Sequence, residues 1–207
     1  NAVDIMQQTV DAVFEQRERT GQPMFPHINH PNFVWGITAE ELMQVKGERF
    51  FEVYNGHPRV NNEGDGTRLS MDMMWDVLLT KRLTELGLGV MYGIGVDDSH
   101  NYHSLGLGRS NVGRGWVMVR AKHLTAESII AAMEAGDFYA TSGVTLREVT
   151  REAGRLAIEV LPQPGVTYEI QFIGTRRGYD PGSELIPPPP EPPAVRPAGL
   201  PGLPPVA

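Results

Sequence analysis

The sequence of 207 residues lacks cysteine altogether. This absence excludes disulfides and thiolate metal sites, so any metal-binding site must be built from His, Asp or Glu. No run of about 18 apolar residues occurs, so no segment is expected to span a membrane. The formal net charge of −7 argues against nonspecific binding to nucleic acid, which requires a basic surface. The G-x-S-x-G motif of serine hydrolases and the Walker phosphate loop are also missing. Compartment and oligomeric state stay open.

Proline is abundant but unevenly distributed. Of 17 prolines, 11 lie between Pro181 and Pro205, in a stretch that contains PPPPEPP. Such a stretch forms neither a helix nor a sheet and buries little apolar surface. We therefore expect residues 181–207 to be a disordered, Pro-rich tail, which serves either as a solvated linker or as a polyproline ligand for an aromatic groove.

The first 140 residues alternate between helical and strand-like patterns. Residues 2–20 carry apolar side chains at helical spacing and are followed by Gly21, a typical helix end. Thr38, Ser70 and Thr125 are predicted to cap three further helices, the last two of which begin apolar periodic segments. Residues 23–32 read as a short strand that runs into a loop at Pro31, and segments 49–56, 89–96 and 113–121 read as further strands. This order is typical of an α/β fold with a parallel sheet or barrel.

Two further expectations concern Arg82, which lies on a predicted helix, and residues 146–180, which follow the alternating segments. Arg82 is the one polar residue on the apolar face of the helix after Ser70, and we expect its tip to reach solvent. Residues 146–180 alternate with period two around turn residues, so they are predicted to form a small antiparallel β extension.

The segment GVDDSHNYH, which follows a predicted strand, contains the residues most suited to chemistry. Asp98 and His100 are two apart, so on extended backbone their side chains point to the same side and can reach one metal ion. Asp97 then points the other way and can orient a neighbouring group. The alternative is an ordinary turn in which Asp98 or Ser99 is only a cap.

Two other predicted strands also end in polar residues. In PHINHPN, His30 beside Pro31 is the better ligand candidate, whereas His27 is expected to be packed or hydrogen-bonded. In FEVYN, Glu52 is either buried, and then paired or ligating, or exposed on an edge strand. Asn55 either binds a ligand or shapes the turn that follows.

The remaining histidines and arginines are weaker candidates. His103 lies beyond the Asp98–His100 pair and is a possible neighbour of the site, while His57 and His123 are expected to be loop or structural residues. Arg109 in the glycine-rich segment SLGLGRSNVGRG either contacts an anionic substrate or is solvated.

Taken in order, the motifs INHPN (28–32), FEVYN (51–55) and GVDDSHNY (95–102) resemble those of the PHP family, the polymerase and histidinol phosphatase metallohydrolases. The segment DFYATSGV (137–144) resembles the end of the domain in a carbaryl-hydrolase-like branch of that family. The resemblance implies a distorted (β/α)7 barrel similar to a TIM barrel. It also implies a divalent metal cofactor, zinc, manganese or iron, that activates water against a small-molecule phosphoester or related ester. Position by position, it implies His30, Asp98 and His100 as metal ligands.

The family's opening His-x-His motif does not occur in the sequence. Residues 1–145 therefore resemble the C-terminal part of the domain, and the chain is expected to be an incomplete piece of a metal-dependent hydrolase. Glu52, Asn55, Asp97, His103 and Arg109 are expected near the metal or the substrate. The alternative is a non-catalytic barrel scaffold or an interaction protein with a Pro-rich tail.

Overall fold

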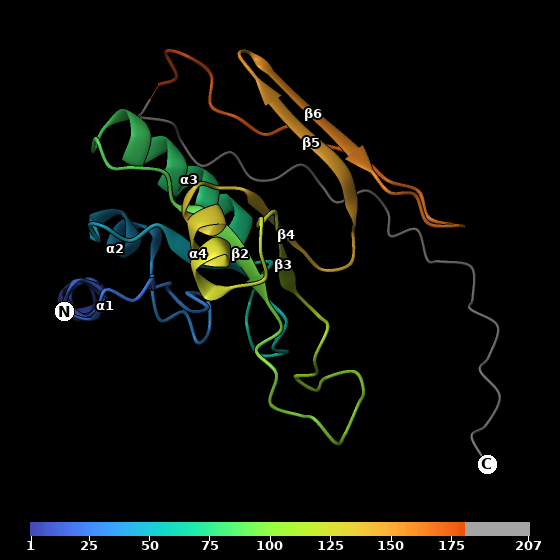
Figure 1. Cartoon of the computed structure of the whole chain (residues 1–207), viewed down its shortest axis with the longest axis horizontal. Helices are drawn as coiled ribbons and strands as arrows, with labels where there is room; N and C mark the ends of the chain where they lie inside the picture. Colours follow the sequence, from blue (N-terminus) through green and yellow to red (C-terminus); the bar gives the residue numbers. More distant parts are fainter. Residues whose placement is uncertain (181–207) are drawn as a thin grey trace. The chain divides into compact units, whose positions relative to one another are not determined.

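A computed structural model of the chain describes residues 1–180 (Figure 1). The predicted Pro-rich tail, residues 181–207, lies outside the described residues. The helices and strands of the described residues fall in the compact unit of residues 1–172. The helices are α1 (Ala2–Thr20), α2 (Ala39–Gln44), α3 (Met71–Thr84) and α4 (Ala126–Glu134). The strands are β1 (Phe50–Asn55), β2 (Tyr92–Val96), β3 (Trp116–Val119), β4 (Phe138–Thr141), β5 (Leu146–Glu152) and β6 (Arg155–Val160).

The predicted helix boundaries are confirmed by their caps. α1 is followed by Gly21 in the left-handed conformation, with φ of 65°. The side chains of Thr38, Ser70 and Thr125 each accept a backbone N–H at the start of α2, α3 and α4. No helix within residues 1–180 is both long and apolar enough to cross a membrane.

The described strands form three separate two-stranded sheets. β1 and β2 are parallel and are connected through α3, as in a βαβ unit, whereas β3–β4 and β5–β6 are antiparallel pairs. Next to β1, the segment around Ile28 forms an isolated parallel bridge to Phe51 rather than a strand. Residues 167–176, expected to belong to the β extension, are not part of a strand in the described chain. These sheets do not close into a barrel, and the barrel stays a prediction.

β1 lies between two apolar clusters. Because side chains alternate along a strand, Phe50 and Phe51 point to opposite faces, and both are fully buried. Phe51 packs into a cluster with apolar residues of α1, α2 and α3. Phe50 packs with Ile94 of β2 and Met133 of α4. The strand is thus fixed from both sides, which positions the polar residues at its carboxyl end.

A β-bulge interrupts the register of β1 and β2. Glu52 pairs with Ile94 and Tyr54 with Gly95, so Val53 is an extra residue without a partner. Gly93 makes room for it, because a Cβ on Gly93 would lie 2.8 Å from Val53 Cγ1. The extra residue changes the alternation, so that the side chains of Glu52 and Asn55 meet although they are three residues apart.

The expectation that Arg82 reaches solvent is wrong. Its side chain is buried and donates hydrogen bonds to the carbonyl oxygens of Val45, Glu48 and Gly89. The guanidinium has five N–H donors, so it can satisfy several loop carbonyls that a purely apolar side chain would leave unpaired. Glu48 is buried nearby, and this burial raises the pKa of its carboxyl to about 7, although the N–H groups of Phe50 and Arg49 and the charge of Arg82 lower it.

Candidate metal site at the ends of two parallel strands

Asn55, the last residue of β1, connects the acidic residues of both strands. Its Nδ2 lies 2.8 Å from Glu52 Oε2 and 3.2 Å from Asp98 Oδ2, beyond the end of β2. Asn55 and Glu52 are both buried, so the buried alternative for Glu52 is the one observed. The amide donates one hydrogen to each carboxylate, which holds the two acidic groups at one place without neutralising either.

Asp98 and His100 form a local pair. His100 Nδ1 lies 2.7 Å from the backbone oxygen of Asp98 and 3.7 Å from its Oδ1. A carbonyl oxygen only accepts, so Nδ1 carries the proton and Nε2 of a neutral His100 keeps its lone pair. This is the arrangement that metal-binding histidines commonly adopt. Asp98 has φ of 46°, a left-handed conformation, rather than the extended backbone expected from the sequence.

His30 is held at the same edge through its backbone. Its N–H donates to Glu52 Oε2 at 2.7 Å, and its ring packs against Phe33 with centroids 5.1 Å apart. The φ of 21° at His30 is rare for a side-chain-bearing residue. His27 Nδ1 lies 3.9 Å from the other oxygen of Glu52. Glu52 therefore contacts both histidines, through the backbone of one and the ring of the other.

The expected ligands are close but are not assembled as one group. Within residues 1–180, no three His, Asp or Glu side chains are arranged to hold a single metal ion. Asp98 and His100 form a pair, and His30 is connected to it through Glu52 and Asn55. The donor chemistry, imidazole and carboxylate oxygen, suits a divalent ion such as zinc, manganese or iron. Asp98 and His100 together can supply two ligands to such an ion.

Asp97 stabilises the loop that follows the site. Its Oδ2 accepts the Gly113 N–H at 2.8 Å, whereas the Asp98 carboxylate contacts Asn55 and His100. In the same loop, the backbone oxygen of Ser110 accepts the N–H groups of both His100 and Asn101, at 3.0 and 2.9 Å. Ser110 is buried, and sequence reasoning missed it. The only feature of the sequence that points to Ser110 is its position in the glycine-rich loop that follows the Asp98–His100 segment.

His103 and Arg109 lie in this loop and are exposed. Among the described residues, no side-chain hydrogen bond or ion pair of either residue reaches the other site residues. Their expected roles near the metal or substrate stay predictions.

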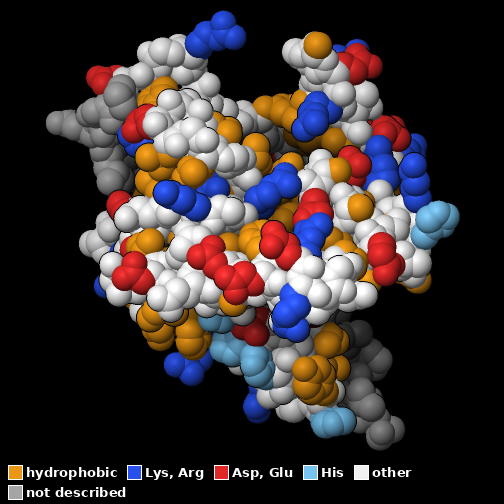
Figure 2. Space-filling model, turned by 60° about the vertical axis from the view of Figure 1, so that its left-hand side comes forward, with side chains coloured by type: hydrophobic (Ala, Val, Ile, Leu, Met, Phe, Trp, Pro, Cys, Tyr) orange, Lys and Arg blue, Asp and Glu red, His pale blue; other side chains and the backbone are white. Residues whose placement is uncertain are grey.

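His57 lies in the loop after β1, as the sequence indicated, and its ring reaches the candidate site. Its ring lies edge to face with that of His100, with centroids 5.5 Å apart, and also contacts Phe33 at 6.1 Å. Its N–H donates to Asn55 Oδ1 at 2.8 Å. The signal that would have found it is its place directly after the end of β1, where the other site residues lie. Figure 2 shows histidine side chains gathered at the lower edge of the molecule, beside hydrophobic groups and an acidic group.

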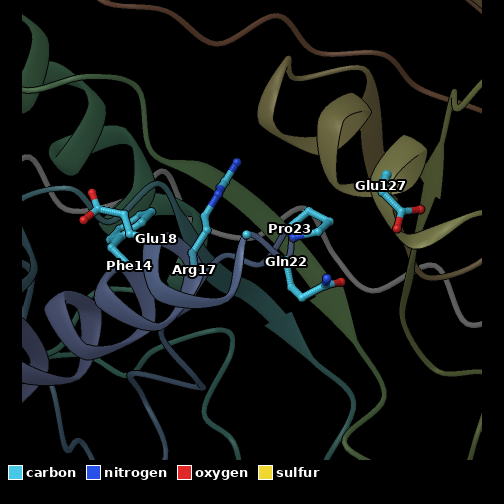
Figure 3. Close-up of a pocket in the computed structure, with 7 residues that line it drawn as sticks. Phe14, Arg17, Glu18, Gln22, Pro23 and Glu127 are labelled. Atoms are coloured by element: carbon cyan, nitrogen blue, oxygen red, sulfur yellow. The ribbon is translucent and has the colours of Figure 1, made fainter.

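Two hollows lie near α1. A pocket of about 560 Å³ lies between the end of α1, which provides Phe14, Arg17 and Glu18, and Glu127 of α4 (Figure 3). Arg17 is bound to Glu134 and to the Met24 oxygen, and no predicted site residue lines this pocket. A second, apolar groove of about 360 Å³ runs between α1 and residues 27–37 and reaches His30.

Comparisons with protein-family models, with curated proteins and with solved structures gave no match to this chain.

Proposed function

We propose that this chain carries part of the site of a PHP-type metal-dependent hydrolase that acts on a phosphoester or related ester. The observation that carries the proposal is the Asp98–His100 pair beyond β2. There the Asp98 carbonyl fixes the proton on His100 Nδ1 and leaves Nε2 free as a ligand, and the Asp98 carboxylate lies 3.7 Å from Nδ1 of the same ring. This pair lies at the carboxyl end of a parallel sheet, where α/β enzymes place their sites.

Each neighbouring residue has a distinct task in this proposal. Asn55 orients the Asp98 carboxylate through Oδ2 and leaves Oδ1 available for a metal. Glu52 fixes the backbone of His30 and the amide of Asn55 with the same oxygen. Asp97 holds the loop that covers the end of β2. A bound divalent ion would supply a water of lowered pKa and polarise the ester.

The metal content of the purified chain tests this proposal. Zinc, manganese and iron are measured by mass spectrometry in this chain and in one extended upstream, because the resemblance implies a His-x-His segment that these 207 residues do not contain. Turnover of a phosphomonoester and a phosphodiester is measured in parallel. We expect His100→Ala to reduce bound metal at least about tenfold.

His123→Ala is the matched control, since His123 is exposed just before α4 and remote in sequence from the Asp98 loop. A longer chain that binds no metal, or a His100→Ala variant that binds as much as the original, contradicts the proposal. In that case the scaffold interpretation is favoured.

A further inference from the structure

The position of His57 is fixed by four contacts. Its backbone N–H donates to Asn55 Oδ1 at 2.8 Å. Its ring Nδ1 accepts the backbone N–H of Arg59 at 3.2 Å. Its ring packs edge to face with the rings of His100 and Phe33. A histidine in a solvated loop would lack this set of constraints, so the ring is held in one orientation at the candidate site.

The contact with Arg59 determines the tautomer of His57. A backbone N–H only donates, so Nδ1 must accept with its lone pair, and the proton of the neutral ring lies on Nε2. Nε2 is on the far side of the ring from Nδ1, so this N–H points away from the backbone of residues 57–59. Within residues 1–180 it donates to no acceptor.

His57 and His100 therefore present opposite chemistry. The ring of His100 keeps its proton on Nδ1, bound to the Asp98 carbonyl, and presents a lone pair at Nε2. The ring of His57 presents an N–H at Nε2 instead. With the proton there, His57 is unsuited to metal binding but suited to donating a hydrogen bond to an oxyanion.

A second positive group lies beside this ring. The guanidinium of Arg59 sits 5.4 Å from the centroid of Phe33, the same ring that His57 contacts. Arg59 is exposed, so its N–H groups are free to bind a ligand. An imidazole N–H and a guanidinium that both contact the ring of Phe33 can donate hydrogen bonds to the oxygens of a phosphoryl group.

We propose that His57, assisted by Arg59, binds an oxygen of the phosphoryl group of the substrate through its Nε2–H. This inference rests on the proposed function for its place in the reaction, and it names a phosphoester rather than a neutral ester as the substrate class. His57 contributes as a hydrogen-bond donor to the anion, while Asp98 and His100 would hold the metal.

Binding of inorganic phosphate to the whole chain, followed by calorimetry, tests the proposal, with acetate as the comparison anion. We expect His57→Ala to weaken phosphate binding about tenfold. His57→Gln, whose side-chain amide places an N–H near the position of Nε2, is expected to regain part of that loss. Arg59→Ala should weaken binding in the same direction, and His123→Ala should leave it unchanged. Phosphate binding by the original chain is expected to exceed acetate binding.

The tautomer provides a readout that depends on neither catalysis nor metal. Long-range proton–nitrogen NMR of the neutral ring is expected to show the His57 proton on Nε2. A proton on Nδ1, undiminished phosphate binding in His57→Ala, or no phosphate binding by the original chain each overturns the proposal. Metal content of the same variants separates the two proposals, because His57→Ala should keep its metal and His100→Ala should lose it. If no variant binds metal but phosphate binding still depends on His57, only the proposed function fails.

Discussion

The rings of His57 and His100 meet edge to face, with centroids 5.5 Å apart and an angle of 85° between their planes. One ring follows β1 and the other follows β2, so this contact joins the two loops at the carboxyl edge of the parallel pair. Backbone groups fix the proton of each ring at opposite nitrogens, through the Arg59 N–H and the Asp98 carbonyl. The same edge thereby presents a hydrogen-bond donor beside a potential metal ligand.

Asn55→Ala is expected to lower the free energy of unfolding by about 2 kcal/mol, because buried Glu52 loses a donor and the His57 N–H loses its acceptor. Urea denaturation followed by circular dichroism measures this change. Asn29→Ala is the control, since Asn29 is exposed in the neighbouring segment. Equal stabilities of the two variants would show that the Asn55 contacts contribute nothing to the fold.

Local sequence signals predicted the helices well. Thr38, Ser70 and Thr125 cap helices because a side-chain oxygen next to a helix start satisfies an N–H that the helix itself leaves free. The convergence of Glu52, Asn55 and Asp98 followed from their places at strand ends. Local patterns could not predict the bulge at Val53, because it depends on contact with Gly93, 40 residues away.

Gly93→Ala is expected to destabilise the chain by about 2 kcal/mol, because the added Cβ would lie 2.8 Å from Val53 Cγ1 and 2.9 Å from Val53 Cβ. Gly89→Ala is the matched control, as a Cβ there meets nothing within 4 Å. Thermal and urea unfolding measure both variants.

The same substitution also tests the bulge through a double-mutant cycle. In a Val53→Gly background the clash is absent, so Gly93→Ala should lose about 1 kcal/mol less stability than in the original chain. An unchanged loss in that background would mean that Val53 is not the residue that Gly93 accommodates.

The misassignment of Arg82 has a physical origin. On a helix face, a long side chain with a charged tip ordinarily reaches water. Here the carbonyl oxygens of Val45, Glu48 and Gly89 converge on its guanidinium from two separate loops, and no sequence pattern shows that convergence. The ring contacts of His57 could not be predicted for a similar reason, since Phe33 and His100 lie in other segments.

Arg82→Lys is expected to reduce stability by about 2 kcal/mol, because one ammonium cannot reach three carbonyl oxygens that a planar guanidinium reaches together. Arg151→Lys, at an exposed position of β5, is the control and should change stability by less than about 0.5 kcal/mol. Urea denaturation at pH 7 makes the comparison. If Lys at position 82 preserves stability, the three hydrogen bonds are replaceable.

Glu48 gives the fold a pH dependence of definite sign. Burial raises the pKa of its carboxyl from 4.5 to about 7, so the folded chain holds this proton more tightly than the unfolded chain does. Its contribution to stability is therefore complete below about pH 4.5, falls as the pH rises to about 7, and then levels off. The rise of the Glu48 pKa from 4.5 to about 7 on folding corresponds to about 3 kcal/mol of folding free energy, which is lost between these two pH values.

Glu48→Gln removes that dependence, because Gln is neutral at every pH and its oxygen can still accept the N–H groups of Arg49 and Phe50. We expect the variant to match the original chain near pH 4.5 and to exceed it by about 3 kcal/mol above pH 7. Urea denaturation across this range measures the difference. Glu152→Gln, exposed on β5, should shift the curve little. A variant whose stability falls with pH as steeply as that of the original chain would assign the dependence to another group, because only the Glu48 carboxyl differs between the two proteins.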